Sequence, residues 1–135
     1  MRLHIIHYLI VLSVFLAIDF LWLSTIGRSF YVQEIGTLLR DRPQLGVAFA
    51  FYALYALGLM FFVIEPAVGS ELSWRTLAIG GFFGLIAYAT YDLTNLATIK
   101  GFTWRVALVD MLWGAALSAA VSIVSLWVFK VLRLS

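Results

Sequence analysis

The sequence has no cysteine, only two prolines and few charged residues, which make up 12% of the 135 positions. The absence of cysteine excludes disulfides, thiolate metal sites, iron–sulfur clusters and cysteine nucleophiles. The nine Lys and Arg leave a net charge of only +2 and form no basic stripe, so we expect no nucleic-acid partner. The two prolines, Pro43 and Pro66, each lie where a predicted helix ends.

The sequence is rich in apolar residues, at 64% of the chain with a mean hydropathy of +1.03. A soluble domain of this length has too small an interior to bury so much apolar surface, whereas apolar runs of about 20 residues are typical of membrane spans. We therefore expect an all-α membrane protein, a four-transmembrane-helix bundle forming one domain over residues 1–135. The predicted spans are about 4–26, 45–64, 75–99 and 104–132, with Lys100-Gly101 ending the third and Thr103 capping the fourth.

The first apolar stretch is too long for a signal peptide and continues into Asp19 and Trp22, which indicates an uncleaved span. Residues 27–40 have a different pattern, with apolar residues at helical spacing opposite polar ones. This pattern predicts a short interfacial amphipathic helix between spans one and two, acting either as a lid or as a plain connection.

The third span has two chemically different sides. At 100° per residue, one side of the predicted helix carries small and then polar residues: Gly80, Gly84, Ala87, Tyr88, Tyr91, Asp92, Asn95 and Thr98. Small residues let a neighbouring helix approach, and a carboxylate in a span must face protein or water. We therefore expect this helix to pack centrally, with Asp92 turned into the bundle.

Three aspartates, Asp19, Asp92 and Asp110, fall at about the same depth, roughly 10 Å inside one membrane face by helix rise. The predicted ligand or proton site comprises Asp19, Trp22, Tyr88, Tyr91, Asp92, Asn95, Thr98, Asp110 and Trp113. Close carboxylates in a low dielectric cannot all be charged, so the group could hold a proton, a hard cation, or an acid/base pair. Alternatively each carboxylate is structural, bonded to a neighbouring helix or paired with Arg28 or Arg105. Tyr52 and Tyr55 are expected mainly in the core.

At the other membrane face, His4 and His7 are three residues apart and Glu65 ends the second span. Two imidazoles and a carboxylate could bind zinc or a haem iron. However, these positions lie near the interface and no further ligand shares their register. We expect a solvated face there, with no metal or other cofactor.

Several segments resemble a known family. They are Tyr-Asp-Leu-Thr-Asn-Leu-Ala-Thr at 91–98, Lys100-Gly101, Val-Asp-Met-Leu-Trp-Gly at 109–114 and Asp-Phe-Leu-Trp-Leu at 19–23. With these, the chain is similar over nearly its whole length to small bacterial membrane proteins grouped as domain of unknown function two-one-seven-seven. The resemblance implies a four-span protein of the bacterial inner membrane and gives some weight to a lipid-related role. It assigns no catalytic residue.

Our leading hypothesis from the sequence is a carboxylate-lined intramembrane pocket that binds or transports a small polar or cationic solute with proton coupling. Four spans are few for a transporter, so transport would need a homodimer. Gly80/Gly84 or Gly114/Ser118 could supply its contacts, unless the same seams are used within the chain. One alternative is a membrane-embedded enzyme or enzyme subunit acting on lipids. It ranks lower because no nucleophile–base pair or metal-ligand set is visible. A third is a structural or assembly subunit without a ligand.

Overall fold

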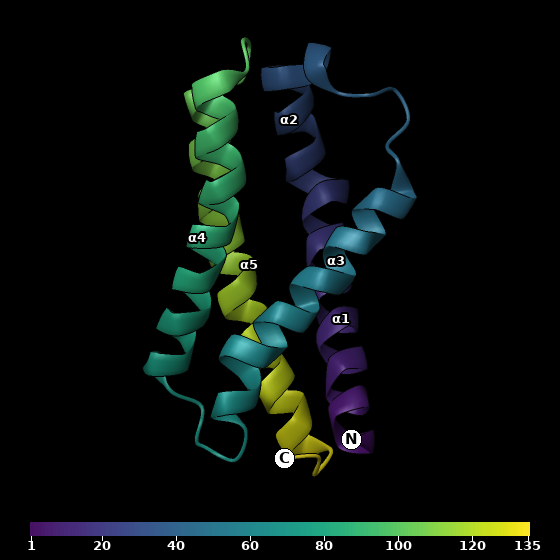
Figure 1. The fold of residues 1–135 in the computed structure, drawn as a ribbon, viewed down its shortest axis with the longest axis vertical. Coiled ribbons are helices and arrows are strands. Elements are labelled where there is room, and N and C mark those ends of the chain that lie inside the picture. Colours follow the sequence, from purple (N-terminus) through teal and green to yellow (C-terminus); the bar gives the residue numbers. More distant parts are fainter.

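The computed structural model describes residues 1–135 and consists of helices joined by short loops. The helices are α1 (Arg2–Trp22), α2 (Arg28–Ile35), α3 (Leu45–Leu59), α4 (Trp74–Thr98) and α5 (Trp104–Val131). Short π and 3₁₀ segments extend two of them, giving four continuous helices long and apolar enough to cross a membrane: Arg2–Leu38, Leu45–Ala67, Trp74–Thr98 and Trp104–Val131. Both chain ends lie at the same end of the bundle, and α3 crosses the other helices at an angle (Figure 1).

The first helix is longer than expected. A π-helical segment, Leu23–Gly27, joins α1 to α2, so the helix runs for 37 residues, about 55 Å by helix rise. This exceeds a hydrocarbon core of about 30 Å. The interfacial helix predicted at 27–40 is not seen as a separate element, because the chain follows the axis of α1 instead of turning (Figure 1). Gly27 is helical and buried beneath the Trp22 ring, and the chain leaves the helix only just before Asp41 and Pro43.

The other helix boundaries follow the sequence signals. Ser73 caps α4 by accepting a hydrogen bond from the Thr76 amide at 3.4 Å, and Thr103 caps α5 by accepting one from the Val106 amide at 3.1 Å. Gly101, in the turn between α4 and α5, has a φ of 88°, a left-handed conformation that suits glycine. The third and fourth spans therefore start and end close to the predicted positions.

α4 packs along α5 through a seam of small residues. A Cβ atom added to Gly84 would collide with the backbone oxygen of Gly114 and the hydroxyl of Ser118. A Cβ on Gly80 would lie 2.9 Å from the Ser122 hydroxyl. The seams expected to supply a dimer contact are thus occupied within one chain. A homodimer stays a prediction and would need other surfaces.

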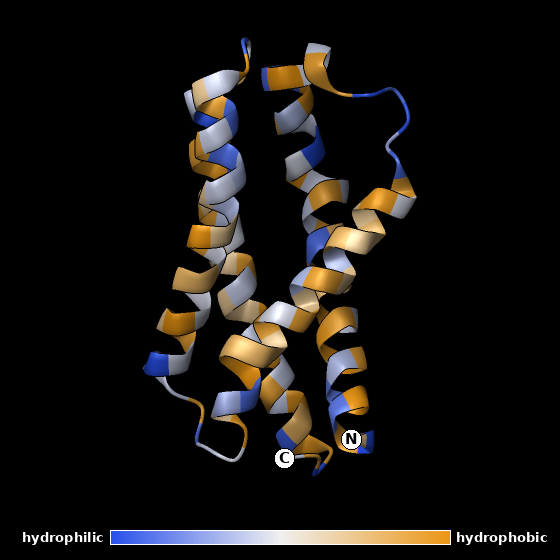
Figure 2. Cartoon of the chain, in the orientation of Figure 1, coloured by the Kyte–Doolittle hydropathy of each residue, from blue (hydrophilic) through white to orange (hydrophobic).

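The apolar core is divided in two. The larger cluster lies in the half of the bundle nearer the chain ends and includes Val11, Phe15, Leu59, Leu117 and Phe129. A smaller cluster joins the end of α2 to the start of α5: Ile35, Phe102, Val106 and Ala107. Figure 2 shows mostly apolar helices with hydrophilic positions in the loops and at isolated sites in the other half of the bundle. Along α1–α2 and α5, Asp19 and Asp110 fall between the two clusters.

Candidate functional site

Asp19 ties three helices together. Its carboxylate, 7% exposed on α1, accepts a hydrogen bond at Oδ2 from the Tyr52 hydroxyl of α3 at 2.7 Å. At Oδ1 it accepts one from the indole Nε1 of Trp113 on α5 at 2.9 Å. Both oxygens of this carboxylate are therefore satisfied by neighbouring helices.

Asp110 belongs to a second series of hydrogen bonds, which lies at about the same height in the bundle as Asp19. Its Oδ1 accepts a hydrogen bond from the Tyr31 hydroxyl of α2 at 2.6 Å, and that hydroxyl accepts one from Trp22 Nε1 at 3.3 Å. The rings of Trp22 and Trp113 stack at 4.5 Å between centroids with an interplanar angle of 13°. The stacked indoles connect the two series of hydrogen bonds, so Asp19 and Asp110 belong to one polar layer.

Asp92 differs from the other two aspartates. It is fully buried on α4, and neither of its carboxyl oxygens has a hydrogen-bond partner. The carboxyl group of Asp110 lies beside it. Two carboxyl groups can hydrogen-bond to each other only when one of them holds a proton, since an ionised carboxylate has no donor. We call Asp92 and Asp110 the carboxyl pair.

Two glycines leave room for aromatic rings of this layer. The Trp22 indole lies against Gly27, where an added Cβ would be 2.5 Å from Nε1. The Tyr88 ring lies directly on Gly114, which leaves no room for a Cβ there. These two glycines leave room for the rings to pack directly against helix backbones.

Residues 4–127 match a family model described as "Predicted membrane protein (DUF2177)". The chain belongs to this family. The family description gives no activity, in agreement with the resemblance noted from the sequence. No curated protein and no solved structure is similar enough to the chain to match it.

Three of the predicted site residues lie at the edge of the layer or beyond it. Tyr91 is 59% exposed and its ring packs edge-on against Phe102. Asn95 is half-buried one turn further along α4. Thr98 is exposed, and its hydroxyl donates to the backbone oxygen of Thr94 at 2.8 Å. Tyr91 and Asn95 border the layer, whereas Thr98 lies outside it.

Two tyrosines of the layer were not among the predicted site residues. Tyr52 was expected mainly in the core, and it does pack against the larger apolar cluster, while its hydroxyl reaches Asp19. Tyr31 was assigned to an interfacial helix at the same membrane face as Asp110, outside the predicted site. Only the continuous α1–α2 helix brings Tyr31 over α5. No signal in the sequence could have found it, because at 100° per residue a spacing of twelve residues puts Tyr31 about 120° around the helix from Asp19.

Neither arginine considered as a partner neutralises the aspartates. Arg105 lies 3.8 Å from Glu34, which also accepts a hydrogen bond from the Thr103 hydroxyl at 3.0 Å, and Arg28 forms no ion pair. Hydrogen bonds from neighbouring helices therefore satisfy the Asp19 carboxylate without a cation. The carboxyl pair has no cationic partner.

Two cavities lie elsewhere in the molecule, away from the aspartates. An apolar groove of about 310 Å³ is lined by Phe62, Val63, Ile79, Phe82, Phe83 and Ile86. A second space of about 120 Å³ lies beside Glu71 and Lys130.

At the other end of the bundle, His7 is not part of a solvated face. Its side chain is 1% exposed and contacts Glu65, whereas His4 is 64% exposed. No group of three or more potential ligands is placed to hold a metal ion. The prediction of a solvated histidine face was wrong for His7, because the end of α5 folds over its ring.

Proposed function

We propose that the protein binds a small cationic or polar solute at the carboxyl pair and exchanges it for a proton held by the same two groups. We also propose that it does so in the bacterial inner membrane. The observation that carries this proposal is Asp92, a fully buried carboxyl group with no hydrogen-bond partner beside a second carboxyl group.

A buried carboxyl group of this kind needs a partner. Leaving a polar group unpaired in an apolar interior costs free energy, and leaving a charge unpaired costs far more. A proton shared with Asp110 satisfies the pair, and so does a cation bound by both groups. Because either occupant satisfies the same oxygens, proton and cation compete for the site.

Asp110 offers a route to the pair. Unlike Asp92, its side chain is partly exposed, and only one of its oxygens accepts a hydrogen bond, from Tyr31. Along α5, Asp110 precedes Lys130 by twenty residues, about 30 Å by helix rise, which is about the thickness of a hydrocarbon core. We propose that Lys130 marks one membrane face, which puts Asp110 nearer the other face than the middle of the membrane. A solute therefore enters from the end opposite the termini.

Asp19 supports a structural role instead. Each of its oxygens already accepts a hydrogen bond from a donor on another helix. The assembly role considered from the sequence thus applies to this one aspartate. It also makes Asp19 the matched control for the other two.

The test is proton release on solute binding. Purified protein in weakly buffered detergent is mixed with monovalent, divalent and organic ammonium cations, and a pH indicator reports released protons. We expect one class of cation to release protons from the wild type and from Asp19→Asn, and no release from Asp92→Asn or Asp110→Asn. Equal release from all four proteins, or none from the wild type with any cation, would contradict the proposal.

A further inference from the structure

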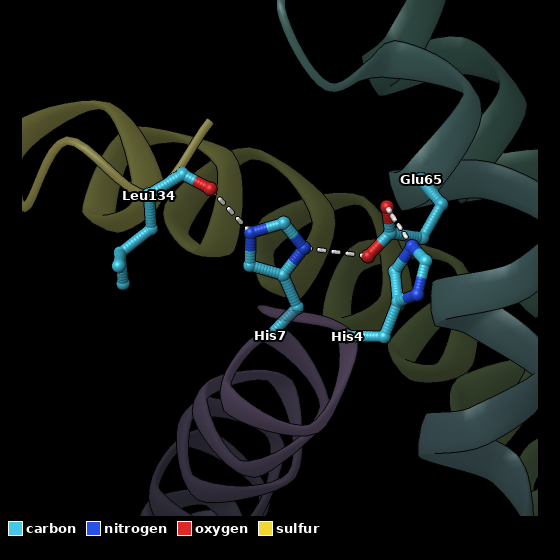
Figure 3. A network of polar contacts seen from close by, with 4 residues as sticks. All are labelled: His4, His7, Glu65 and Leu134. Carbon is cyan, nitrogen blue, oxygen red and sulfur yellow. Dashed lines mark hydrogen bonds and ion pairs between the residues drawn. The ribbon is translucent and has the colours of Figure 1, made fainter. Parts of the chain in front are cut away.

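His7 is 1% exposed and lies between Glu65 and the backbone oxygen of Leu134 (Figure 3). Its Nδ1 lies 2.6 Å from Glu65 Oε1, and its Nε2 lies 2.7 Å from the backbone oxygen of Leu134. The ring stacks on Phe129 at 3.9 Å with an interplanar angle of 13°. One side chain of α1 thus contacts both the end of the second span and the end of α5.

The proton count of this arrangement is fixed by its acceptors. A backbone carbonyl only accepts, so His7 Nε2 carries a hydrogen and donates to Leu134. The contact to Glu65 then needs one more proton. Because an imidazole is more basic than a carboxylate, His7 Nδ1 holds this proton and donates it to Glu65 Oε1. The two side chains together then hold one proton more than a neutral imidazole and a carboxylate.

From this geometry we infer that His7 and Glu65 form a second proton-binding site, separate from the carboxyl pair, which when occupied fastens the end of α5 to the first two spans. Loss of the proton leaves the lone pair of Nδ1 facing a carboxylate oxygen at 2.6 Å. Two acceptors cannot remain at that distance, so the remaining ring hydrogen shifts to Nδ1, where the charged carboxylate holds it, and the hydrogen bond from Nε2 to Leu134 is lost.

Among the charged groups near the site, the proton on His7 is the main partner of Glu65. On α1, His4 Nε2 lies 3.9 Å from Glu65 Oε2, but its side chain is 64% exposed. Arg2 on α1, and Lys130 and Arg133 at the end of α5, form no ion pair with Glu65. From α5 itself, Phe129 and the Leu134 carbonyl face His7. A proton on His7–Glu65 is therefore the only buried positive charge that Glu65 contacts.

The backbone at the end of α5 depends on an outside contact. The Leu134 amide donates to Phe129 at 2.7 Å and the Arg133 amide donates to Lys130 at 3.2 Å, which is the pattern of a Schellman motif. That motif needs a left-handed residue, here Arg133 with a φ of 57°. A residue with a Cβ disfavours this conformation. The hydrogen bond from His7 to the next carbonyl helps to hold it, so emptying the site loosens this turn.

Two readouts test the site in a His4→Gln background, where His7 is the only histidine. Nitrogen-15 NMR of the imidazole reports its protonation, and amide hydrogen exchange, corrected for intrinsic rates, reports protection of residues 130–134. We expect both His7 nitrogens to carry or share protons while the segment is protected. As pH rises and the site empties, the segment should exchange about tenfold faster or more.

Glu65→Gln is the discriminating variant. A glutamine amide can donate to Nδ1 of a neutral His7, so the tether remains but needs no extra proton. We expect a singly protonated His7 and pH-independent protection of residues 130–134. His7 protonation therefore distinguishes Glu65→Gln from the parent even when the parent keeps its extra proton over the whole accessible pH range. His7→Phe keeps an aromatic ring against Phe129 but removes both hydrogen bonds, so the amides of residues 130–134 should exchange rapidly at every pH.

Three results would overturn the inference. One is a bare His7 nitrogen in the parent while residues 130–134 are protected. Another is unchanged protection after the His7 signal has titrated. The last is identical His7 protonation in the parent and Glu65→Gln. Arg133→Gly relieves the left-handed residue and serves as the control for the turn, because it should reduce the effect of emptying the site without changing His7 protonation.

Discussion

Asp19 and Asp92 are the same side chain in opposite environments. Asp19 accepts hydrogen bonds from Tyr52 and Trp113, which come from two other helices. Asp92 accepts none and is completely buried. A polar group with all its partners stabilises the structure that supplies them, whereas one without partners costs stability and is retained for another reason. Under the proposed function, the contrast separates a structural aspartate, Asp19, from a functional one, Asp92.

This contrast predicts unequal effects on stability. Asp19→Ala leaves the Tyr52 hydroxyl and the Trp113 indole unpaired, so we expect a loss of about 1–3 kcal/mol in the free energy of unfolding. Asp92→Asn should cost less than about 0.5 kcal/mol, because the amide can donate to Asp110 in place of the proton. Thermal unfolding in detergent, followed by circular dichroism, measures both. A larger loss of unfolding free energy for Asp92→Asn than for Asp19→Ala would contradict the structural role given to Asp19.

At the scale of helices, two features place the polar layer. The unbroken α1–α2 helix carries Asp19, Trp22 and Tyr31 past α5, and the contact of Glu34 with Thr103 fixes its far end. The glycine seam brings α4 against α5, which sets Asp92 beside Asp110. A change of helix separation at the seam would therefore alter the carboxyl pair as well as the packing.

The seam predicts a sharp difference between two neighbouring glycines of α4. Gly84→Ala forces a methyl group against the backbone of Gly114, so we expect a loss of about 1–3 kcal/mol from overpacking. Gly81→Ala is the matched control, because its nearest neighbour, the Ala115 oxygen, is 3.7 Å from the added Cβ. Alanine also favours the helix, so Gly81→Ala should be neutral or stabilising. Equal melting temperatures for the two variants would contradict the packing described.

At the scale of the whole molecule, titratable groups gather at both ends of an apolar bundle. The carboxyl pair lies near the turn that joins α4 to α5, which Figure 1 places at the end of the bundle opposite the termini. His7 lies near the start of α1, where it contacts Glu65 (Figure 3). Between them lies the larger apolar cluster, with Phe15, Leu59 and Leu117 fully buried. The two proposed proton sites are therefore separate, and each can be removed without touching the other.

Much of this arrangement could be predicted from the sequence. Apolar runs gave the four spans, and helical periodicity turned Asp92 and the glycines of α4 inward, because both signals are local. The convergence of Asp19 and Asp110 followed from counting residues along each span.

Other features depend on contacts between distant segments. A glycine and a change to amphipathic periodicity at residue 27 suggested a break, but the Trp22 ring packs on Gly27 and the helix continues. That error removed Tyr31 from the site. The burial of His7 depends on the carbonyl of Leu134, 127 residues away, and no local pattern encodes a backbone acceptor at that distance.

The most direct test of the central claim is infrared difference spectroscopy of the carboxyl groups. Buried protonated carboxylic acids have a carbonyl stretch separate from the amide bands, and its frequency shifts in heavy water. We predict such a band in the wild type at neutral pH, unchanged in Asp19→Asn, absent in Asp92→Asn, and lost when the cation that releases protons is added. A spectrum without the band, or a band that persists in Asp92→Asn, would contradict a proton held by Asp92 and Asp110.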